Sequence, residues 1–235
     1  MDTTCTPFEP VRCHTFITEA TFGLPIYRWT PQAEVFAEIN AWWRRNQQQG
    51  RASLLLGYSL GKAQRLLAGI DPAIGPIFTH GAVERLNHDY RATGVVLPPT
   101  RYVGEIGRGF DWSQALIVAP PSAHGSTWTR KFGAYSAAFA SGWMRIRGAR
   151  RRRAVDRGFV LSDHVDWPSL TAAIEATGAE RIWVTHGYTA VVARWLNERG
   201  YDAHAVPTRF EGDAETSSAA DEQDVLEEGQ LPQQS

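Results

Sequence analysis

Short apolar runs closed by small polar residues alternate along this chain with segments of helical periodicity. Runs of this kind predict buried strands, and apolar positions recurring every three or four residues predict helices. The predicted strands are residues 15–18, 52–56, 77–79, 115–119, 159–161, 182–184 and 203–206, with a strand-like segment inside 138–144. The predicted helices are residues 32–49, 82–92, 168–177 and 189–199, and residues 97–109 read as loop. The alternation predicts an α/β fold with largely parallel strands flanked by helices.

Two histidines follow predicted strands in matching positions. His164 comes shortly after the run at 159–161, and His186 directly follows the one at 182–184. Sites in α/β proteins gather where parallel strands end, so neighbouring strands would bring the two imidazoles together. Asp163 and Asp166 flank His164 and could orient its ring. Two unrelated loop histidines are the alternative, but the matching positions favour a site.

Charge is balanced overall but unevenly distributed. The net charge is −1, yet seven arginines lie between Arg145 and Arg157, and seven acidic residues with no basic one follow Gly212. The acidic tail, poor in aromatic residues, is predicted to be disordered. The arginine run is either a solvated surface or a strip that contacts a nucleic-acid backbone, and we favour the second. Its candidate contacts are Arg150, Arg151, Arg152 and Arg153.

Several sequence features narrow the setting and suggest further phosphate contacts. No apolar run approaches the ~20 residues of a membrane span, and no signal peptide is recognisable, so we expect a cytoplasmic protein without a membrane partner. The segment G-Y-S-L-G-K-A-Q at 57–64 predicts a turn into a helix with Lys62 in its first turn, although it lacks the P-loop spacing. Lys62 and Ser126, in a polar glycine-bearing turn, are candidate phosphate contacts.

Three stretches together resemble the β-CASP nucleases of the metallo-β-lactamase superfamily. They are I-T-E-A-T-F-G at 17–23, G-Y-S-L-G-K-A-Q at 57–64, and the pair S-D-H at 162–164 and T-H-G at 185–187. Order and spacing agree over roughly residues 11–212. The details A-T-F-G-L-P-I-Y-R-W and F-A-S-G-W-M-R most resemble the bacterial ligase-associated DNA exonucleases.

The resemblance implies a role for each matching residue. His186 matches a ligand to one of two zinc ions, His164 a general acid beside the scissile phosphate, and Glu19 a carboxylate that holds this histidine. It also implies a β-CASP domain at 20–157 inserted in an incomplete metallo-β-lactamase fold at 1–19 and 158–212, before a tail at 213–235. The family's main zinc motif, H-x-H-x-D-H, is absent, so we expect this chain alone to hold zinc poorly.

The implied function is metal-dependent hydrolysis of DNA phosphodiester bonds in repair, with an ATP-dependent DNA ligase or a helicase as a possible partner. Two alternatives stay open: a non-catalytic nucleic-acid-binding fragment or subunit, and an RNA-processing nuclease of the same family. The missing motif has three explanations: a mis-called start, a disrupted gene or a separate subunit. Cleavage polarity and oligomeric state are not predicted.

Overall fold

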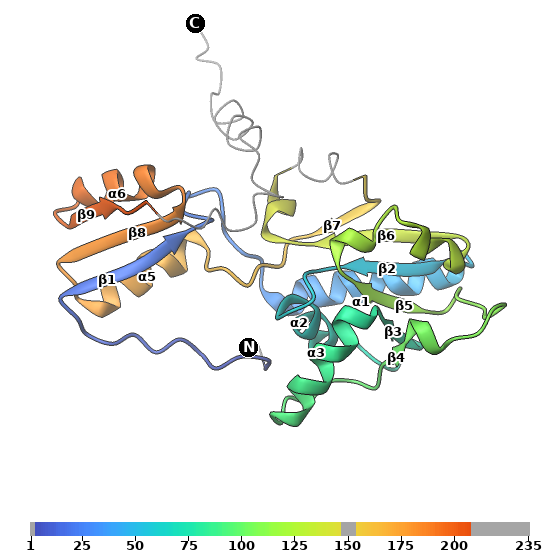
Figure 1. Ribbon diagram of the computed structural model, residues 1–235. Coiled ribbons are helices and arrows are strands. Elements are labelled where there is room, and N and C mark those ends of the chain that lie inside the picture. Colours follow the sequence, from blue (N-terminus) through green and yellow to red (C-terminus); the bar gives the residue numbers. More distant parts are fainter. Residues whose placement is uncertain (1–2, 147–153, 208–235) are drawn as a thin grey trace, which may run out of the picture. The chain divides into compact units, whose positions relative to one another are not determined.

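The computed structural model describes residues 3–146 and 154–207, which form two compact units (Figure 1). Among the described residues, the first unit comprises residues 3–7, Trp29–Met144 and residues 154–163. The second comprises Phe8–Arg28, residues 145–146 and residues 164–207. Most of the first unit therefore lies along the chain between two segments of the second, Phe8–Arg28 and residues 164–207.

A six-stranded sheet forms the centre of the first unit, in the order β4-β3-β5-β2-β6-β7. Its strands are β2 (Ala52–Leu56), β3 (Ile77–Thr79), β4 (Arg101–Tyr102), β5 (Leu116–Ala119), β6 (Tyr135–Ala140) and β7 (Arg157–Phe159). Every neighbouring pair in this sheet is parallel, as the alternation of strands and helices predicts. The central strand β2 is buried at every position, which is why it reads as an unbroken apolar run.

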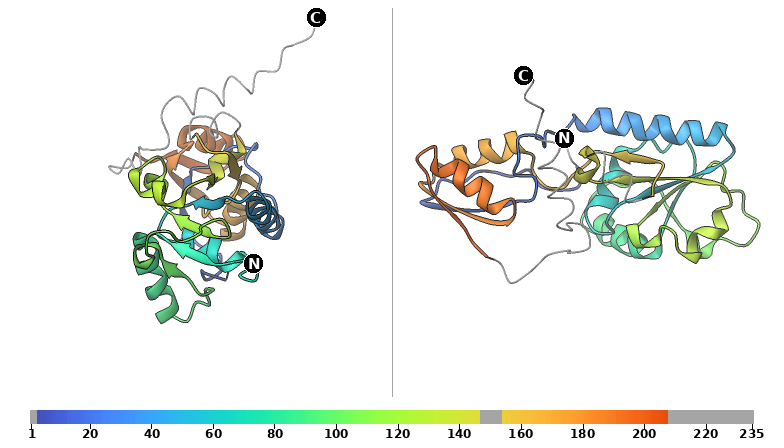
Figure 2. Two further views of the ribbon diagram at one scale, coloured as in Figure 1. Left: turned by 90° about the vertical axis from the view of Figure 1, so that its right-hand side faces the viewer. Right: turned by 90° about the horizontal axis from the view of Figure 1, so that it is seen from above.

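Three helices cover the first unit's sheet: α1 (Gln32–Gln48), α2 (Lys62–Gly69) and α3 (Gly81–Ala92). Both views in Figure 2 place α1 along one face of the sheet. Its buried side recurs at helical spacing through Val35, Phe36, Ile39, Trp42 and Trp43. These side chains pack in one core with residues of α2, β2, β3 and β5. Short 3₁₀ helices at Val103–Glu105, Pro121–Ala123, Thr127–Phe132 and Gly142–Arg145 connect the remaining elements.

The second unit is a smaller parallel sheet in the order β1-β8-β9 with two helices. Its elements are β1 (Thr15–Ala20), α5 (Trp167–Thr177), β8 (Arg181–Gly187), α6 (Thr189–Asn197) and β9 (Asp202–Ala205). Ile182 and Val184 are buried in one core with side chains of α5 and α6. Ile17 and Trp183 are 59% and 38% exposed. Because side chains alternate along a strand, both helices lie on the face opposite Trp183.

The prediction that 159–161 and 182–184 are neighbouring strands is wrong. β7 ends at Phe159 and pairs with β6, whereas β8 pairs with β1 and β9 in the other sheet. An apolar run shows that a strand is buried but not which sheet contains it. The loop predicted at 97–109 is also only partly correct, because it contains β4 and a 3₁₀ helix.

Several predictions concern residues or properties that the structure does not test. The acidic tail from 213 onwards and Arg150–Arg153 lie outside the described residues. The boundaries predicted at 19/20 and 157/158 stay predictions beside the observed unit changes near residues 28 and 163. Among the described residues, no helix combines the length and apolar character needed to cross a membrane.

Candidate functional site

A β-bulge at the end of β8 sets the position of His186. The register pairs Glu19 with Thr185 and then Ala20 with Gly187, so His186 has no opposite residue in the β1–β8 ladder. The φ angle of His186 is +53°, which is uncommon for a residue other than glycine. Bulges re-aim side chains and are over-represented beside active sites. His186 is exposed at this point.

The glycine after His186 is required by the closeness of β1. Gly187 has a φ of +76°, and a Cβ added there would lie 2.5 Å from the carbonyl carbon and oxygen of Ala20. It would also lie 2.6 Å from the Cα of Thr21. Backbone atoms cannot move aside as a flexible side chain can, so only glycine fits. The T-H-G sequence thus encodes the bulge and the tight contact between the two strands.

Glu19 and His164 are in contact at the same end of the sheet. The distance from Glu19 Oε1 to His164 Nδ1 is 3.3 Å, and Glu19 Oε2 accepts a hydrogen bond of 2.6 Å from the Thr21 amide. The ring of Phe22 meets the His164 ring edge-on, with centroids 5.9 Å apart. A carboxylate at Nδ1 fixes the orientation of an imidazole and favours a proton on that nitrogen.

The carboxylate of Glu19 keeps its negative charge. Partial burial by itself would raise the pKa of Glu19, but the hydrogen bonds from His164 and Thr21 outweigh burial. The pKa of Glu19 therefore lies below its ordinary value, and the group is ionised at neutral pH. Glu19 belongs to β1, which pairs with β8, so its contact with His164 brings that histidine to the sheet that contains His186. The two histidine motifs therefore need not follow neighbouring strands.

The two aspartates beside His164 have other partners. Asp163 forms ion pairs with Lys62 at 3.0 Å and with Arg65 at 3.3 Å. Asp166 caps α5 by accepting a hydrogen bond of 3.1 Å from the Ser169 amide. Both flank His164 in the sequence and were candidates to orient its ring, and a carboxylate of β1, that of Glu19, contacts Nδ1.

Lys62 lies inside the first unit. Its side chain is 4% exposed, and its Nζ donates a 2.9 Å hydrogen bond to the Leu161 carbonyl besides pairing with Asp163. Arg65 lies one turn further along α2, binds the Ser162 carbonyl and Gln32, and was missed by the sequence analysis. Its spacing of three residues from Lys62 was the available signal. The role of Lys62 in phosphate binding stays a prediction.

Ser126 has hydrogen-bond partners close to it in the chain. Ser126 caps the 3₁₀ helix Thr127–Phe132 by accepting from the Trp128 amide at 3.3 Å, and it donates to the Ala123 carbonyl at 2.8 Å. It is therefore a local cap within the first unit, and a phosphate contact there stays a prediction. Arg150, Arg151, Arg152 and Arg153 are outside the described residues.

The described residues do not fit the zinc centre that the resemblance implied. Among residues 3–146 and 154–207, no group of three or more His, Cys, Asp or Glu side chains is arranged to hold a metal ion. A structural or catalytic zinc usually needs three or four protein ligands. Glu19, the acid nearest to the bulge along the β1–β8 ladder, is already bonded to His164 and Thr21.

Comparison with known proteins changes the functional interpretation. No family model matches the chain. The chain is similar to a protein of Opitutus terrae (strain DSM 11246 / JCM 15787 / PB90-1) named "Probable DNA ligase", with 32% identity over 193 residues. These residues are 81% of this chain but 18% of that protein. The chain thus spans less than a fifth of the relative's length.

The expectation of a nuclease is contradicted by this similarity. The relative's name is that of a ligase, whereas the resemblance implied a hydrolase that cleaves DNA exonucleolytically, with an RNA-processing nuclease as an alternative. Both nuclease assignments are therefore wrong. The name says nothing of the β-CASP or metallo-β-lactamase families, so membership in them stays a prediction.

Proposed function

We propose that this chain is a DNA-binding part of an enzyme system that joins DNA ends, as a segment or a companion of a DNA ligase. The observation that carries the proposal is the 32% identity to a probable DNA ligase over 81% of the chain. The chain spans only 18% of that relative, so our proposal for this chain is DNA binding, and the joining reaction belongs to the remainder of the enzyme system. DNA is the proposed partner in either arrangement.

The ends of β1 and β8 are the proposed contact with the DNA backbone. Glu19 holds the imidazole of His164, and the bulge presents His186 beside the same strand end. Imidazole N–H groups donate to phosphate oxygens, and contacts of this kind position a protein on DNA without reading its sequence. The Glu19 carboxylate lies 3.3 Å from Nδ1 of His164 and fixes the orientation of this ring.

For the fold alone, we propose a β-CASP domain inserted in an incomplete metallo-β-lactamase fold. The order of the strands supports this proposal. The chain enters the three-stranded sheet at β1, makes the whole six-stranded sheet with β2 to β7, and returns to the first sheet at β8. An inserted domain has this connectivity. The motifs at 17–23, 57–64, 162–164 and 185–187 are the other support.

The functional proposal is tested by DNA binding of the full chain, measured by fluorescence anisotropy. We expect tighter binding to a nicked duplex than to an intact duplex of the same sequence. His164→Ala and His186→Ala should each weaken binding about 10-fold, the effect of losing one charge-assisted hydrogen bond. His204→Ala is the matched control, because His204 is exposed in the same unit and pairs with Asp202 instead.

Two results would contradict the proposal. Equal affinity for nicked and intact duplexes would remove the link to end joining. An equal effect of His164→Ala and His204→Ala would show that the strand ends of β1 and β8 do not contact DNA.

A further inference from the structure

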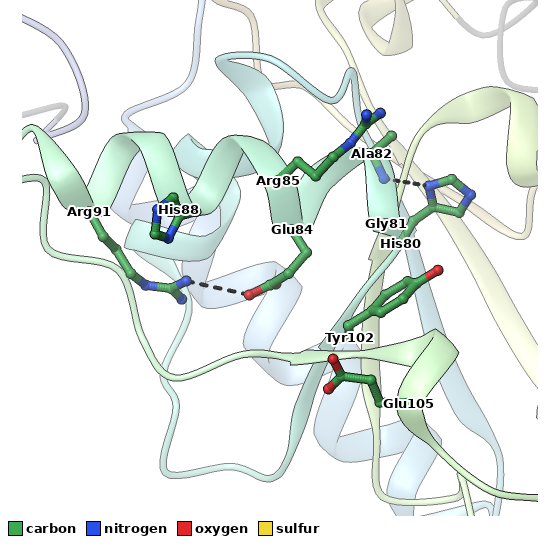
Figure 3. A pocket seen from close by; sticks show the side chains of 9 residues that line it. All are labelled: His80, Gly81, Ala82, Glu84, Arg85, His88, Arg91, Tyr102 and Glu105. Atoms are coloured by element: carbon green, nitrogen blue, oxygen red, sulfur yellow. Dashed lines mark hydrogen bonds and ion pairs between the residues drawn. The ribbon is translucent and has the colours of Figure 1, made fainter.

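A pocket of about 650 Å³ lies in the first unit beside the start of α3 (Figure 3). Its volume falls within the range of about 300–1,000 Å³ that is usual for small-molecule sites. A cavity of this size has room for a ligand of nucleotide size but not for a DNA duplex. The lining residues used below are His80, Glu84, Arg85, His88, Tyr102 and Glu105.

Glu84 and Arg91 form the fixed framework of the pocket. Glu84 accepts hydrogen bonds from the hydroxyls of Thr79 and Thr100, and it pairs with Arg91 at 3.5 Å. Arg91 also donates to the Pro98 carbonyl at 2.8 Å. Burial would raise the pKa of Glu84, but these bonds outweigh burial and keep its pKa below the ordinary value. Their two charges neutralise each other, so neither is the main attraction for a ligand.

His80 contributes a hydrogen-bond donor at the pocket wall. Its Nδ1 accepts from the Ala82 amide at 3.1 Å, so in the neutral ring the proton lies on Nε2. Partial burial, together with the charge of Lys131, lowers the pKa of His80 and favours this neutral form at physiological pH. The ring also meets Trp128 edge-on, with centroids 4.9 Å apart, which fixes its orientation.

Tyr102 is held between two glycines. A Cβ on Gly81 would lie 3.2 Å from the Tyr102 hydroxyl, and a Cβ on Gly104 would lie 2.6 Å from it and 2.4 Å from the ring. The absence of side chains at both positions lets the phenol lie against the first turn of α3. Figure 3 shows Tyr102 beside Gly81 and His80 in this part of the pocket. Tyr102 as a residue remains 39% exposed.

Arg85 and His88 add exposed side chains one turn apart on α3, and Glu105 adds a carboxylate from the facing 3₁₀ helix. The lining therefore combines a guanidinium, two imidazoles, a phenol and an exposed carboxylate. A guanidinium binds phosphate oxygens through two parallel N–H groups. A carboxylate accepts hydrogen bonds from sugar hydroxyls, and a phenol or imidazole ring packs against a base.

We propose that this pocket binds a nucleoside monophosphate, either free or as the terminal nucleotide of a DNA strand. Arg85, with the N–H of His80 and the hydroxyl of Tyr102, takes the phosphate, and Glu105 takes a sugar hydroxyl. The exposed carboxylate disfavours a bare anion and favours a ligand with both a phosphate and hydroxyl groups. Binding of the free nucleotide is independent of the proposed function, whereas binding of a DNA end rests on it.

Calorimetric titration of the full chain tests the pocket with thymidine 5′-monophosphate, thymidine and inorganic phosphate. We expect the monophosphate to bind at least ~10-fold more tightly than the other two, because each of them lacks one half of the contacts. Arg85→Ala should weaken the monophosphate by ~10- to 100-fold and Tyr102→Phe by a smaller factor. Arg44→Ala is the control, since Arg44 is an exposed arginine of the same unit that pairs with Asp71.

Equal binding of all three compounds, or equal effects of Arg85→Ala and Arg44→Ala, would overturn the proposal. Thermal melting of each variant shows that a loss of binding is not a loss of fold.

Single-stranded oligonucleotides with and without a 5′-phosphate distinguish the two sources of the ligand, a DNA end and a free nucleotide. If Arg85→Ala weakens only the phosphorylated strand, a DNA end is the ligand; if it affects the monophosphate alone, the free nucleotide is. If the chain binds the monophosphate but has equal affinity for nicked and intact duplexes, the proposed function is refuted. The proposal that the pocket binds a free nucleotide is then still supported.

Discussion

Glu19 joins the candidate site to the stability of the second unit. The ordinary pKa of this carboxyl is 4.5, and in the fold it is lower. A group whose pKa is lowered by folding stabilises the protein above its unfolded pKa, and this contribution disappears as the pH falls through the folded value. We therefore expect Glu19→Gln to cost ~0.5–1 kcal/mol at pH 7, the usual upper range for a partly exposed pair.

Urea unfolding at pH 7 and below pH 4 measures this prediction. The difference between wild type and Glu19→Gln should shrink at the lower pH, because the wild-type carboxyl is then increasingly protonated. Glu175→Gln is the control, an exposed carboxylate on α5 in the same unit. A difference that is independent of pH would show that the charge of Glu19 does not stabilise the fold.

The bulge at the end of β8 depends on the close approach of the β1 backbone to Gly187. Gly187→Ala places a methyl group against the β1 backbone at Ala20 and also forces alanine to a positive φ. The conformation costs ~1–2 kcal/mol and the overlap a further ~1–3 kcal/mol, so we expect a loss of about 3 kcal/mol in the free energy of unfolding. Denaturant unfolding measures the loss.

Gly200→Ala separates the two causes. Gly200 also has a positive φ, +88°, but a Cβ there meets nothing within 4 Å. We expect a loss of only about 1–2 kcal/mol, because the conformational cost remains and the overlap is absent. Equal losses in the two variants would mean that the strands do not approach as closely as described.

The elements of this fold were predictable where burial leaves a simple pattern. β2 and β3 have the bounds that their apolar runs predict, and α1 differs from its prediction by one residue. The assignment of β7 to a different sheet from β8 was not predictable, because which strands pair depends on contacts between distant segments. β4 was hidden because it has two exposed residues in a segment rich in proline and glycine.

The contact between Glu19 and His164 was predictable from the sequence, but the bulge beside it was not. The resemblance named Glu19 as the carboxylate that holds His164, and the two are in contact. Local sequence also offered Asp163 and Asp166, which flank His164, and in the fold Asp163 pairs with Lys62 while Asp166 caps α5. The bulge at His186 left one trace in the sequence, the glycine that follows it.

At the scale of the whole molecule, most of the first unit lies along the chain between β1 and β8 of the second unit. The chain leaves the smaller sheet after β1 and returns to it at β8, so the insertion separates Glu19 from His186 by most of the first unit. The arginine run between Arg145 and Arg157 falls where the chain completes that insertion. The proposed DNA contact at His164 and His186, with Glu19 behind it, therefore combines segments that precede and follow β2 to β7 in the chain.

The last prediction concerns this arginine run. Replacing Arg150, Arg151, Arg152 and Arg153 by glutamine removes four positive charges, and we expect weaker binding to every DNA sequence alike. Each lost contact with a duplex phosphate should reduce the magnitude of the slope of log K against log salt by about 0.9, because fewer counterions are released. Glutamine at four exposed arginines elsewhere, Arg44, Arg108, Arg194 and Arg199, is the charge-matched control. An unchanged slope in the first variant, or equal changes in both, would show that the run does not bind DNA phosphates.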